Sequence, residues 1–278
     1  MVNNSKRTET PLIETKNFKG QYGVTETFIK DESKNPFGTI KDRRNWHILQ
    51  EANRLKVDKL VLITSGNNGY SLAQLAKGSS IKVVCIINKD ISQEMKVLLS
   101  SVAYQVIEVN LDYKILRPEE IVAFAREKDD EVIWDVTNGY EEYYSLAVDE
   151  ILKTIKPDYI VVPVGSGGIY LGFVQALENR KSSAKVIGIG VQNTVNSFAD
   201  KLSTPWTPYA RALEHYNKLG HSIYRLTEDE VKKTHQIFKN MLDCEPSSSI
   251  VFAALQKNKF RPKDVIVFLN SGKNIIGK

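Results

Sequence analysis

The stretch that decides the fold is "KLVLITSGNNGYSLAQLAK", residues 59–77. It opens with a continuous apolar run, passes through a turn rich in Gly and Asn, and continues from residue 70 with apolar residues at helical spacing. A continuous apolar run of this length is typical of a strand buried on both faces, as in parallel sheets covered by helices. The stretch therefore predicts one strand–turn–helix unit of an α/β protein.

The same alternation continues along the chain. Further apolar runs that we expect to form strands are residues 81–88, 104–110, 131–137, 158–165, 184–191 and 264–270. Helical patterns cover residues 92–102, 118–128 and 141–155, and Thr227 with Glu230 forms a capping box that opens another helix. The sequence therefore predicts a doubly wound α/β fold.

Length and charge limit the classes of function that the protein can have. The 278 residues can bury a real core, and the net charge of +5, from 38 basic and 33 acidic residues, is too small and dispersed to predict a nucleic-acid partner. No apolar run approaches the roughly 18 residues that a membrane span needs, and no secretory signal is visible. Cys85 and Cys244 follow no metal-binding spacing. We expect a cytoplasmic protein with no metal site and no membrane or nucleic-acid partner.

Three strand-to-helix junctions are unusually rich in Gly, Ser and Asn. They are "TSGNNG" at 64–69, "VGSGG" at 164–168 and "NSGKN" at 270–274. In open α/β sheets, ligands bind outside the carboxyl ends of the strands. These junctions are therefore the candidate ligand-binding loops.

The glycine loop at 164–168 has two interpretations. Gly165, Gly167 and Gly168 would let backbone N–H groups approach a phosphate at a helix N-terminus, but they would also suit a tight turn without a ligand. A dinucleotide fingerprint is disfavoured because Tyr170 stands at its third glycine position, and no Walker loop is present.

The other two junctions carry side chains that could bind a ligand. Thr64, Ser65, Asn67 and Asn68 could surround an anion such as a carboxylate, whereas a simple helix cap would explain only one hydroxyl and one glycine. Ser271 could hydrogen-bond a buried heteroatom. Earlier in the chain, "NPFGTIKDRR" at 35–44 places Lys41 between a turn and an expected helix, as either a nucleophile or a surface charge.

Taken in order, these motifs resemble the pyridoxal-phosphate enzymes of the tryptophan synthase β-subunit superfamily, fold type II. The group includes threonine synthase, cysteine synthase and the serine/threonine dehydratases. The resemblance runs from "TPL" at 10–12 to the C-terminus and includes "EPSSSIVFAAL" at 245–255, which is similar to the family's Glu-Pro-Ser helix start.

The resemblance implies two doubly wound α/β domains with mostly parallel sheets and the cofactor in the cleft between them. The larger, cofactor-binding domain would comprise residues 1–34 and 146–278. The smaller domain, residues 35–145, would carry the lysine and the substrate-carboxylate loop.

The resemblance also implies a role for each candidate residue. Lys41 would form the Schiff base with pyridoxal 5'-phosphate, Asn67 would bind the ring oxygen, and Ser271 would face the pyridine nitrogen. The residues that would bind the cofactor phosphate are Gly165, Ser166, Gly167 and Gly168. Thr64, Ser65 and Asn68 would hold the substrate carboxylate. Lys273 is the rival to Lys41 for the covalent role.

The implied function is a lyase or synthase, most similar to threonine synthase, that eliminates or replaces the side-chain leaving group of a small amino acid. The substrate could be phosphorylated, and we expect a homodimer. A cysteine synthase-like β-replacement enzyme, a serine/threonine dehydratase and a non-catalytic cofactor-binding relative remain alternatives.

Overall fold

The computed structural model describes residues 9–15, 18, 22–24, 26–112, 114–194, 197–204, 207–239 and 242–276. The chain forms two compact units. The first contains Lys41–Tyr140 with residues 275–276, and the second contains the described residues from 9 to 40 with Glu141–Asn274. The domain boundaries expected after residues 34 and 145 stay a prediction.

The first unit is built on a four-stranded sheet in the order β5-β4-β3-β6, in which all neighbours are parallel. The strands are β3 (Lys59–Ile63), β4 (Lys82–Asn88), β5 (Gln105–Val109) and β6 (Ile133–Asp135). The helices are α1 (Lys41–Arg54), α2 (Asn67–Ala76), α3 (Gln93–Ser100) and α4 (Pro118–Ala125).

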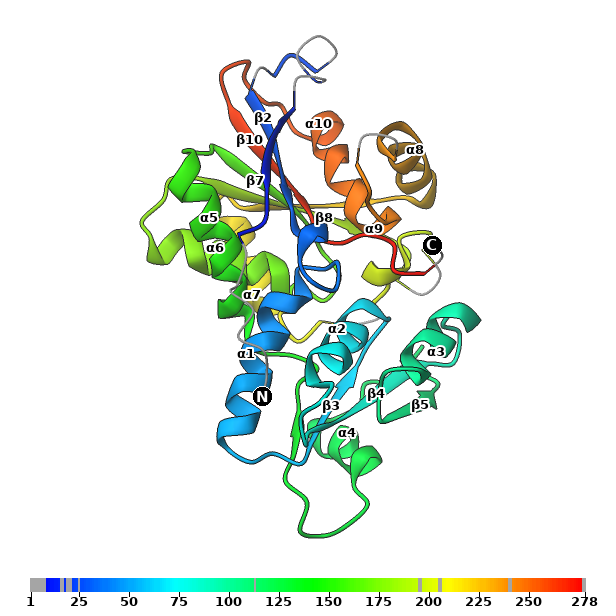
Figure 1. The fold of residues 1–278 in the computed structure, drawn as a ribbon. Helices are drawn as coiled ribbons and strands as arrows, with labels where there is room; N and C mark the ends of the chain where they lie inside the picture. The colour runs from blue at the N-terminus through cyan, green and yellow to red at the C-terminus, as the bar shows by residue number, and fades with distance from the viewer. Residues whose placement is uncertain are drawn as a thin grey trace. The chain divides into compact units, whose positions relative to one another are not determined.

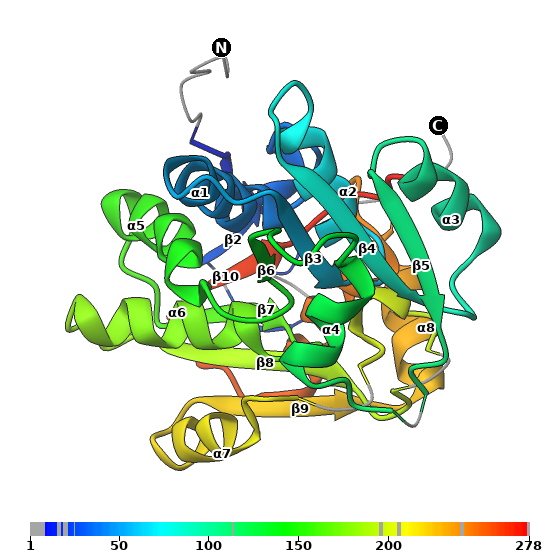
Figure 2. The same cartoon turned by 90° about the horizontal axis from the view of Figure 1, so that it is seen from below.

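Both faces of this sheet are buried, as its continuous apolar strands require. Leu60 and Leu62 of β3 pack in one core with residues of α1, α2 and α3. Val61, which points to the other face, packs with Ile121 of α4 in a second core. Figure 2 shows α4 lying against the strands of this sheet.

The second unit is built on a six-stranded sheet in the order β1-β2-β10-β7-β8-β9. All neighbours are parallel except β1 and β2. The strands are β1 (Leu12–Thr15), β2 (Glu26–Asp31), β7 (Tyr159–Pro163), β8 (Lys185–Val191), β9 (Ser222–Leu226) and β10 (Val265–Asn270). The helices are α5 (Ser145–Thr154), α6 (Gly168–Asn179), α7 (Ala210–Lys218), α8 (Glu228–Phe238), α9 (Pro246–Ser249) and α10 (Ala254–Lys257). Short 3-10 helices are η1 (Glu32–Lys34), η2 (Glu141–Tyr144), η3 (Asp200–Leu202) and η4 (Ile250–Ala253).

Helices also cover both faces of the second sheet. Val161 of β7 packs in a core with residues of α8 and η4, and its neighbour Val162 packs in a separate core with residues of α5 and α6. In Figure 1, α5 and α6 lie on one face of the sheet and α8 and α10 on the other. The predicted α/β fold with mostly parallel sheets is confirmed.

Three strands were not expected from the sequence. β1 and β9 are the two edges of the larger sheet, so neither needs a continuous apolar run. β2 is an interior strand whose buried polar residues have partners: Lys30 pairs with Glu150, and Asp31 accepts from Asn270. The polar residues of β2, "ETFIKD", and of β9, "SIYRL", hide the strand signal. The expected strand at 131–137 is confined to β6, three residues long.

The described part of the chain contains no helix long and apolar enough to cross a membrane. No group of three or more His, Cys, Asp or Glu side chains within it is placed to hold a metal ion. Burial raises the pKa of the Cys85 thiol to about 12. Burial, together with the nearby acidic groups, raises the pKa of Cys244 to about 12 as well. Both thiols are therefore protonated at neutral pH, which makes them poor nucleophiles and metal ligands.

Candidate active site

Lys41 is half-buried and is the first residue of α1, directly after the turn at 35–40. The turn is closed by a hydrogen bond of 2.9 Å from Gly38 N to Asn35 O, with Gly38 at φ +79°. The Asn35 Nδ2 atom donates to the buried Glu32 carboxylate at 2.7 Å. This network fixes the turn, and with it the position at which α1 begins.

The same turn is attached to the segment after β10. Ile40 N donates to Ser271 O at 2.8 Å, and Lys273 N donates to Gly38 O at 3.0 Å. A Cβ atom on Gly38 would lie 2.5 Å from Lys273 Cε, so the aliphatic chain of Lys273 packs over this glycine. The residue that precedes Lys41, Ile40, is thus hydrogen-bonded to the predicted ring-nitrogen residue.

Ser271 presents a buried, uncharged hydroxyl at the carboxyl end of β10. Its Oγ lies 2.8 Å from Ser248 Oγ. The Ser248 hydroxyl also lies 3.1 Å from Gly272 O, and either serine can be the donor in the contact between the two hydroxyls. When Ser271 accepts from Ser248, its own single hydrogen can be donated to a ring nitrogen.

The amide loop at 64–69 links β3 to α2 and is shaped by two glycines. A Cβ atom on Gly66, which has φ +132°, would lie 2.5 Å from Met95 Cε, and one on Gly69 would lie 2.7 Å from Thr64 Cγ2. Thr64 Oγ1 accepts hydrogen bonds from Gly66 N at 3.0 Å and Gly69 N at 3.1 Å. Thr64 therefore stabilises the loop through its hydroxyl oxygen, and it can donate its hydroxyl hydrogen to a ligand.

The loop's other candidate side chains differ in exposure. Ser65 is exposed, Asn67 is buried and Asn68 is half-buried. The Asn68 Oδ1 atom is buried and, among the described residues, accepts no hydrogen bond. Such orphaned buried atoms are rare and indicate a missing partner.

The glycine loop joins β7 to α6 at the carboxyl edge of the larger sheet. Because β7 and β10 are parallel neighbours, this loop and Ser271 leave adjacent strands at the same edge. Gly167, at φ +107°, precedes α6, whose first backbone bond runs from Leu171 N to Gly167 O at 3.0 Å. The N–H groups of the first helical turn have no partner within the helix and carry partial positive charge.

The residues around the glycine loop hold it tightly. A Cβ atom on Gly167 would lie 3.2 Å from Leu213 Cδ1, and one on Gly165 would lie 3.3 Å from Leu202 Cα. The hydroxyl of Thr207, a residue outside the loop, donates to Ser166 O and so holds the middle of the loop in place. A side chain at Gly165 or Gly167 would therefore have to displace its neighbours slightly, whereas one at Gly168 would make ordinary contact, 3.5 Å from Glu141 Cγ.

Two positioning residues escaped the sequence reasoning. Asn45 is buried in α1, and its Nδ2 donates to Asn68 O and to Ser71 Oγ, both at 3.0 Å. The sequence did contain a sign of this role, because Asn45 stands one helical turn after Lys41 and therefore on the same face of the helix. Ser248, which lies in the recognised "EPSSS" stretch, gave no signal of its contact with Ser271.

Comparison with known proteins identifies the family. The family described as pyridoxal-phosphate dependent enzyme matches residues 5–272. The chain belongs to this family. A curated relative, cystathionine beta-synthase of Apis mellifera, is 26% identical over 201 residues. That match covers 67% of this chain and 40% of the relative's length.

Solved structures share the fold. Maize serine racemase matches with a TM-score of 0.80 and 18% identity, over 96% of this chain and 89% of its own. Threonine deaminase isoform 2 of Solanum lycopersicum matches with a TM-score of 0.75 and 17% identity, over 96% of this chain and 84% of its own. At these identities the likeness is one of fold.

The residues present fit the family's cofactor. The backbone N–H groups of the glycine loop before α6 suit a phosphate, and the Ser271 hydroxyl suits a pyridine nitrogen. None of these features requires a metal or a second prosthetic group.

Proposed function

We propose that the protein is a pyridoxal-phosphate enzyme that eliminates or replaces the side-chain leaving group of a small amino acid, with threonine synthase-like chemistry as the first candidate. The observation that supports this most is the environment of Ser271. A buried hydroxyl, hydrogen-bonded to a second hydroxyl, ends β10 where an ionised carboxylate could otherwise stand.

Each group has a proposed task. The glycine loop at 165–168 would bind the cofactor phosphate, Asn67 would bind the ring oxygen, and Lys41 would hold the cofactor covalently. Thr64, Ser65 and Asn68 would hold the substrate carboxylate. These assignments follow the family motifs and the loop shapes described above.

The reaction class follows from the Ser271 hydroxyl. When bound, the cofactor withdraws electrons from the α-carbon of an attached amino acid. The Lys41 amine would take the α-proton, after which a leaving group on the β-carbon could depart with its bonding electrons. A leaving group on the γ-carbon, as in O-phosphohomoserine, would depart only after a β-proton had been removed as well. Ser271 donates a hydrogen bond without transferring a full proton, so the ring would be a moderate electron sink, which favours elimination and replacement over transamination.

Product analysis separates the candidates. The cofactor-loaded protein is incubated with O-phosphohomoserine, O-acetylserine with sulfide, serine and threonine. Inorganic phosphate with threonine supports the threonine synthase-like proposal, and a new carbon–sulfur bond supports the cysteine synthase-like one. Ammonia with a keto acid, formed without a second substrate, identifies a dehydratase. Transamination as the main reaction would contradict the proposal, and a loaded protein that forms no product would be a non-catalytic relative.

We also propose a cytoplasmic location and a homodimeric assembly. Both cysteines are free thiols, as is usual for proteins of a reducing compartment. Sedimentation of the loaded protein would test the assembly.

A further inference from the structure

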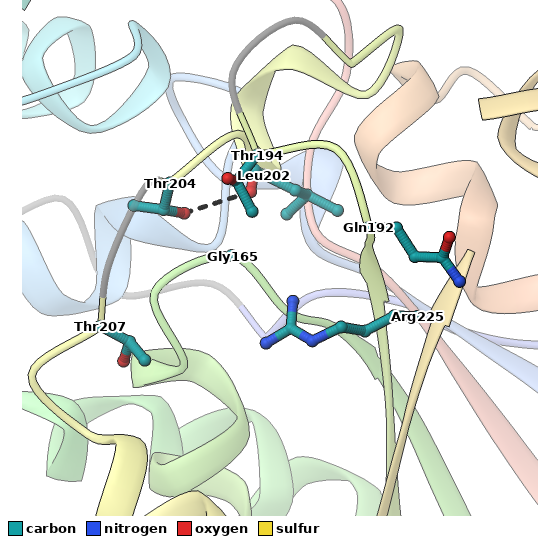
Figure 3. Close-up of a pocket in the computed structure, with 7 residues that line it drawn as sticks. All are labelled: Gly165, Gln192, Thr194, Leu202, Thr204, Thr207 and Arg225. Atoms are coloured by element: carbon teal, nitrogen blue, oxygen red, sulfur yellow. Dashed lines mark hydrogen bonds between the residues drawn. The ribbon is translucent and has the colours of Figure 1, made fainter. Parts of the chain in front are cut away.

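A pocket of about 260 Å³ lies within the second unit and is lined in part by Gly165 of the glycine loop. It opens at the carboxyl ends of β7 and β8 and beside β9 (Figure 3). The described residues that line it are Gly165, Gln192, Thr194, Leu202, Thr204, Thr207 and Arg225. Arg225 is the one charged side chain among them.

Arg225 is exposed to solvent, and its side chain lines the pocket. Its Nη1 donates to Val191 O at 3.2 Å. A Cβ atom on Gly190 would lie 3.5 Å from the same nitrogen, so the guanidinium lies across a position of β8 that carries no side chain. Figure 3 shows it directed from β9 toward the loop at Gly165. A guanidinium has five N–H donors, so its bond to Val191 leaves several for a ligand.

The hydroxyls of the pocket wall divide into two groups. Thr204 Oγ1 donates to Leu202 O at 3.1 Å, and Thr207 donates to Ser166 O, so both stabilise the wall itself. Thr194 and Gln192 follow β8; Figure 3 shows Thr194 beside Leu202 and the Gln192 amide directed away from Arg225. The pocket thus combines one solvent-exposed cation with neutral polar groups.

This composition selects the ligand's chemistry. The described lining contains no carboxylate that could attract a cation. An oxyanion, in contrast, would be attracted by the positive charge of the guanidinium and could accept two hydrogen bonds from its planar N–H donors. Gly165 belongs both to this pocket and to the loop that precedes α6, so the helix N-terminus and Arg225 act on the same region from two sides.

We propose that this pocket binds a phosphate group, with Arg225 as its cationic partner. The phosphate could be that of the cofactor or a second one, free or carried by a substrate. The proposal concerns Arg225 and is independent of the assignment of Lys41, so the two can fail separately.

Phosphorus NMR of the cofactor-loaded protein tests the proposal. Inorganic phosphate is titrated into the parent, Arg225→Gln and Arg225→Lys, and the resonance and retention of the bound cofactor are followed in parallel. The matched control is Arg180→Gln, which removes the same charge at the other end of α6, where Arg180 pairs with the exposed Asp149.

Either of two results would support the proposal. If the phosphate is a second one, the loaded parent binds inorganic phosphate, and Arg225→Gln weakens that binding at least about tenfold, with partial recovery in Arg225→Lys. If it is the cofactor's, Arg225→Gln shifts the cofactor resonance and weakens cofactor retention at least about tenfold. The proposal is overturned if Arg225→Gln matches Arg180→Gln in phosphate binding, cofactor resonance and cofactor retention.

Discussion

Gly167 combines two constraints in one residue. Its φ of +107° strains any residue with a side chain, and a Cβ atom there would lie 3.2 Å from Leu213 Cδ1. We expect Gly167→Ala to destabilise the fold by about 1–3 kcal/mol and to weaken cofactor retention, because the loop must shift. Equilibrium dialysis of the cofactor and urea unfolding of the cofactor-free protein measure the two effects.

Gly23→Ala is the matched control for this prediction. Gly23 also has a positive φ, +69°, but a Cβ atom there would meet nothing within 4 Å. The control should share part of the destabilisation and keep the cofactor as tightly as the parent. Equal cofactor retention in both variants would contradict the cradle assignment.

Ser271 and Ser248 offer a second test at the residue scale. Ser271→Ala removes the hydroxyl proposed to face the ring nitrogen, and we expect cofactor affinity to fall by about 1 kcal/mol, or about fivefold. The absorbance of the bound cofactor should also change. Ser248→Ala keeps the Ser271 hydroxyl and should leave the absorbance nearly unchanged. An absorbance change of the same size in both variants would contradict a direct role for Ser271.

At the scale of elements, His221 connects the end of α7 to β8. It is buried, and its Nδ1 accepts a hydrogen bond of 3.0 Å from Val186 N. Burial, and secondarily the charge of Lys185, lowers the pKa of His221 below its usual 6.5. The unfolded chain therefore binds the proton more readily, so stability from this group is present above about pH 6.5 and is lost as pH falls below it.

Urea unfolding at several pH values between 7.5 and 5 measures this loss. His221→Asn keeps an acceptor but does not titrate, so its stability should fall less over this range than that of the parent. His215→Asn, which changes an exposed histidine of α7, should behave as the parent does. Parallel curves for the parent and His221→Asn would show that His221 is not the titrating group.

Lys59 anchors the start of β3 to the segment after α4. The fully buried Lys59 Nζ lies 2.9 Å from Glu131 Oε1 and 3.1 Å from Glu127 Oε2. Burial alone would lower the pKa of Lys59, but hydrogen bonds from the ammonium to Glu131 and Glu127 reverse this and raise it. The Glu127 N–H, and next the Lys59 ammonium, lower the pKa of Glu131 to about 2.

We expect Lys59→Met to destabilise the protein by about 1–3 kcal/mol at pH 7, because two carboxylates lose their cation. In the parent, the stabilisation from Glu131 is present above about pH 4.5 and is lost as pH falls toward 2. That loss should be smaller in Lys59→Met. Unchanged stability at pH 7 would mean that the carboxylates find other partners.

At the scale of the whole molecule, the parallel sheets could be predicted because their strands are buried on both faces. β3, β4, β7, β8 and β10 lie within the expected apolar runs. The capping box of Thr227 and Glu230 opens α8 as predicted. The edge strands β1 and β9 could not be predicted, since one side of an edge strand has no neighbour and tolerates polar residues, whereas the edge strands β5 and β6 of the smaller sheet lie within expected apolar runs.

The candidate loops could also be predicted, because glycines and short polar residues after a strand are visible in the sequence. The contacts that orient them could not. The bond from Asn45 to Asn68 spans 23 positions, and the pairing of Ser248 with Ser271 joins two segments that meet only in the folded unit. The place of Arg225 could not be predicted for the same reason. Its strand, β9, is separated by β8 from β7, the strand that leads into the glycine loop.

The central claim is that Lys41 carries the cofactor, and one measurement tests it most directly. Borohydride reduction of the cofactor-loaded protein makes the bond between the cofactor and its lysine permanent, and peptide mapping by mass spectrometry identifies that lysine. The account predicts the adduct on Lys41, with no adduct in Lys41→Ala and an unchanged one in Lys273→Ala. An adduct on Lys273 or any other lysine of the loaded parent, or none at all, would contradict the account.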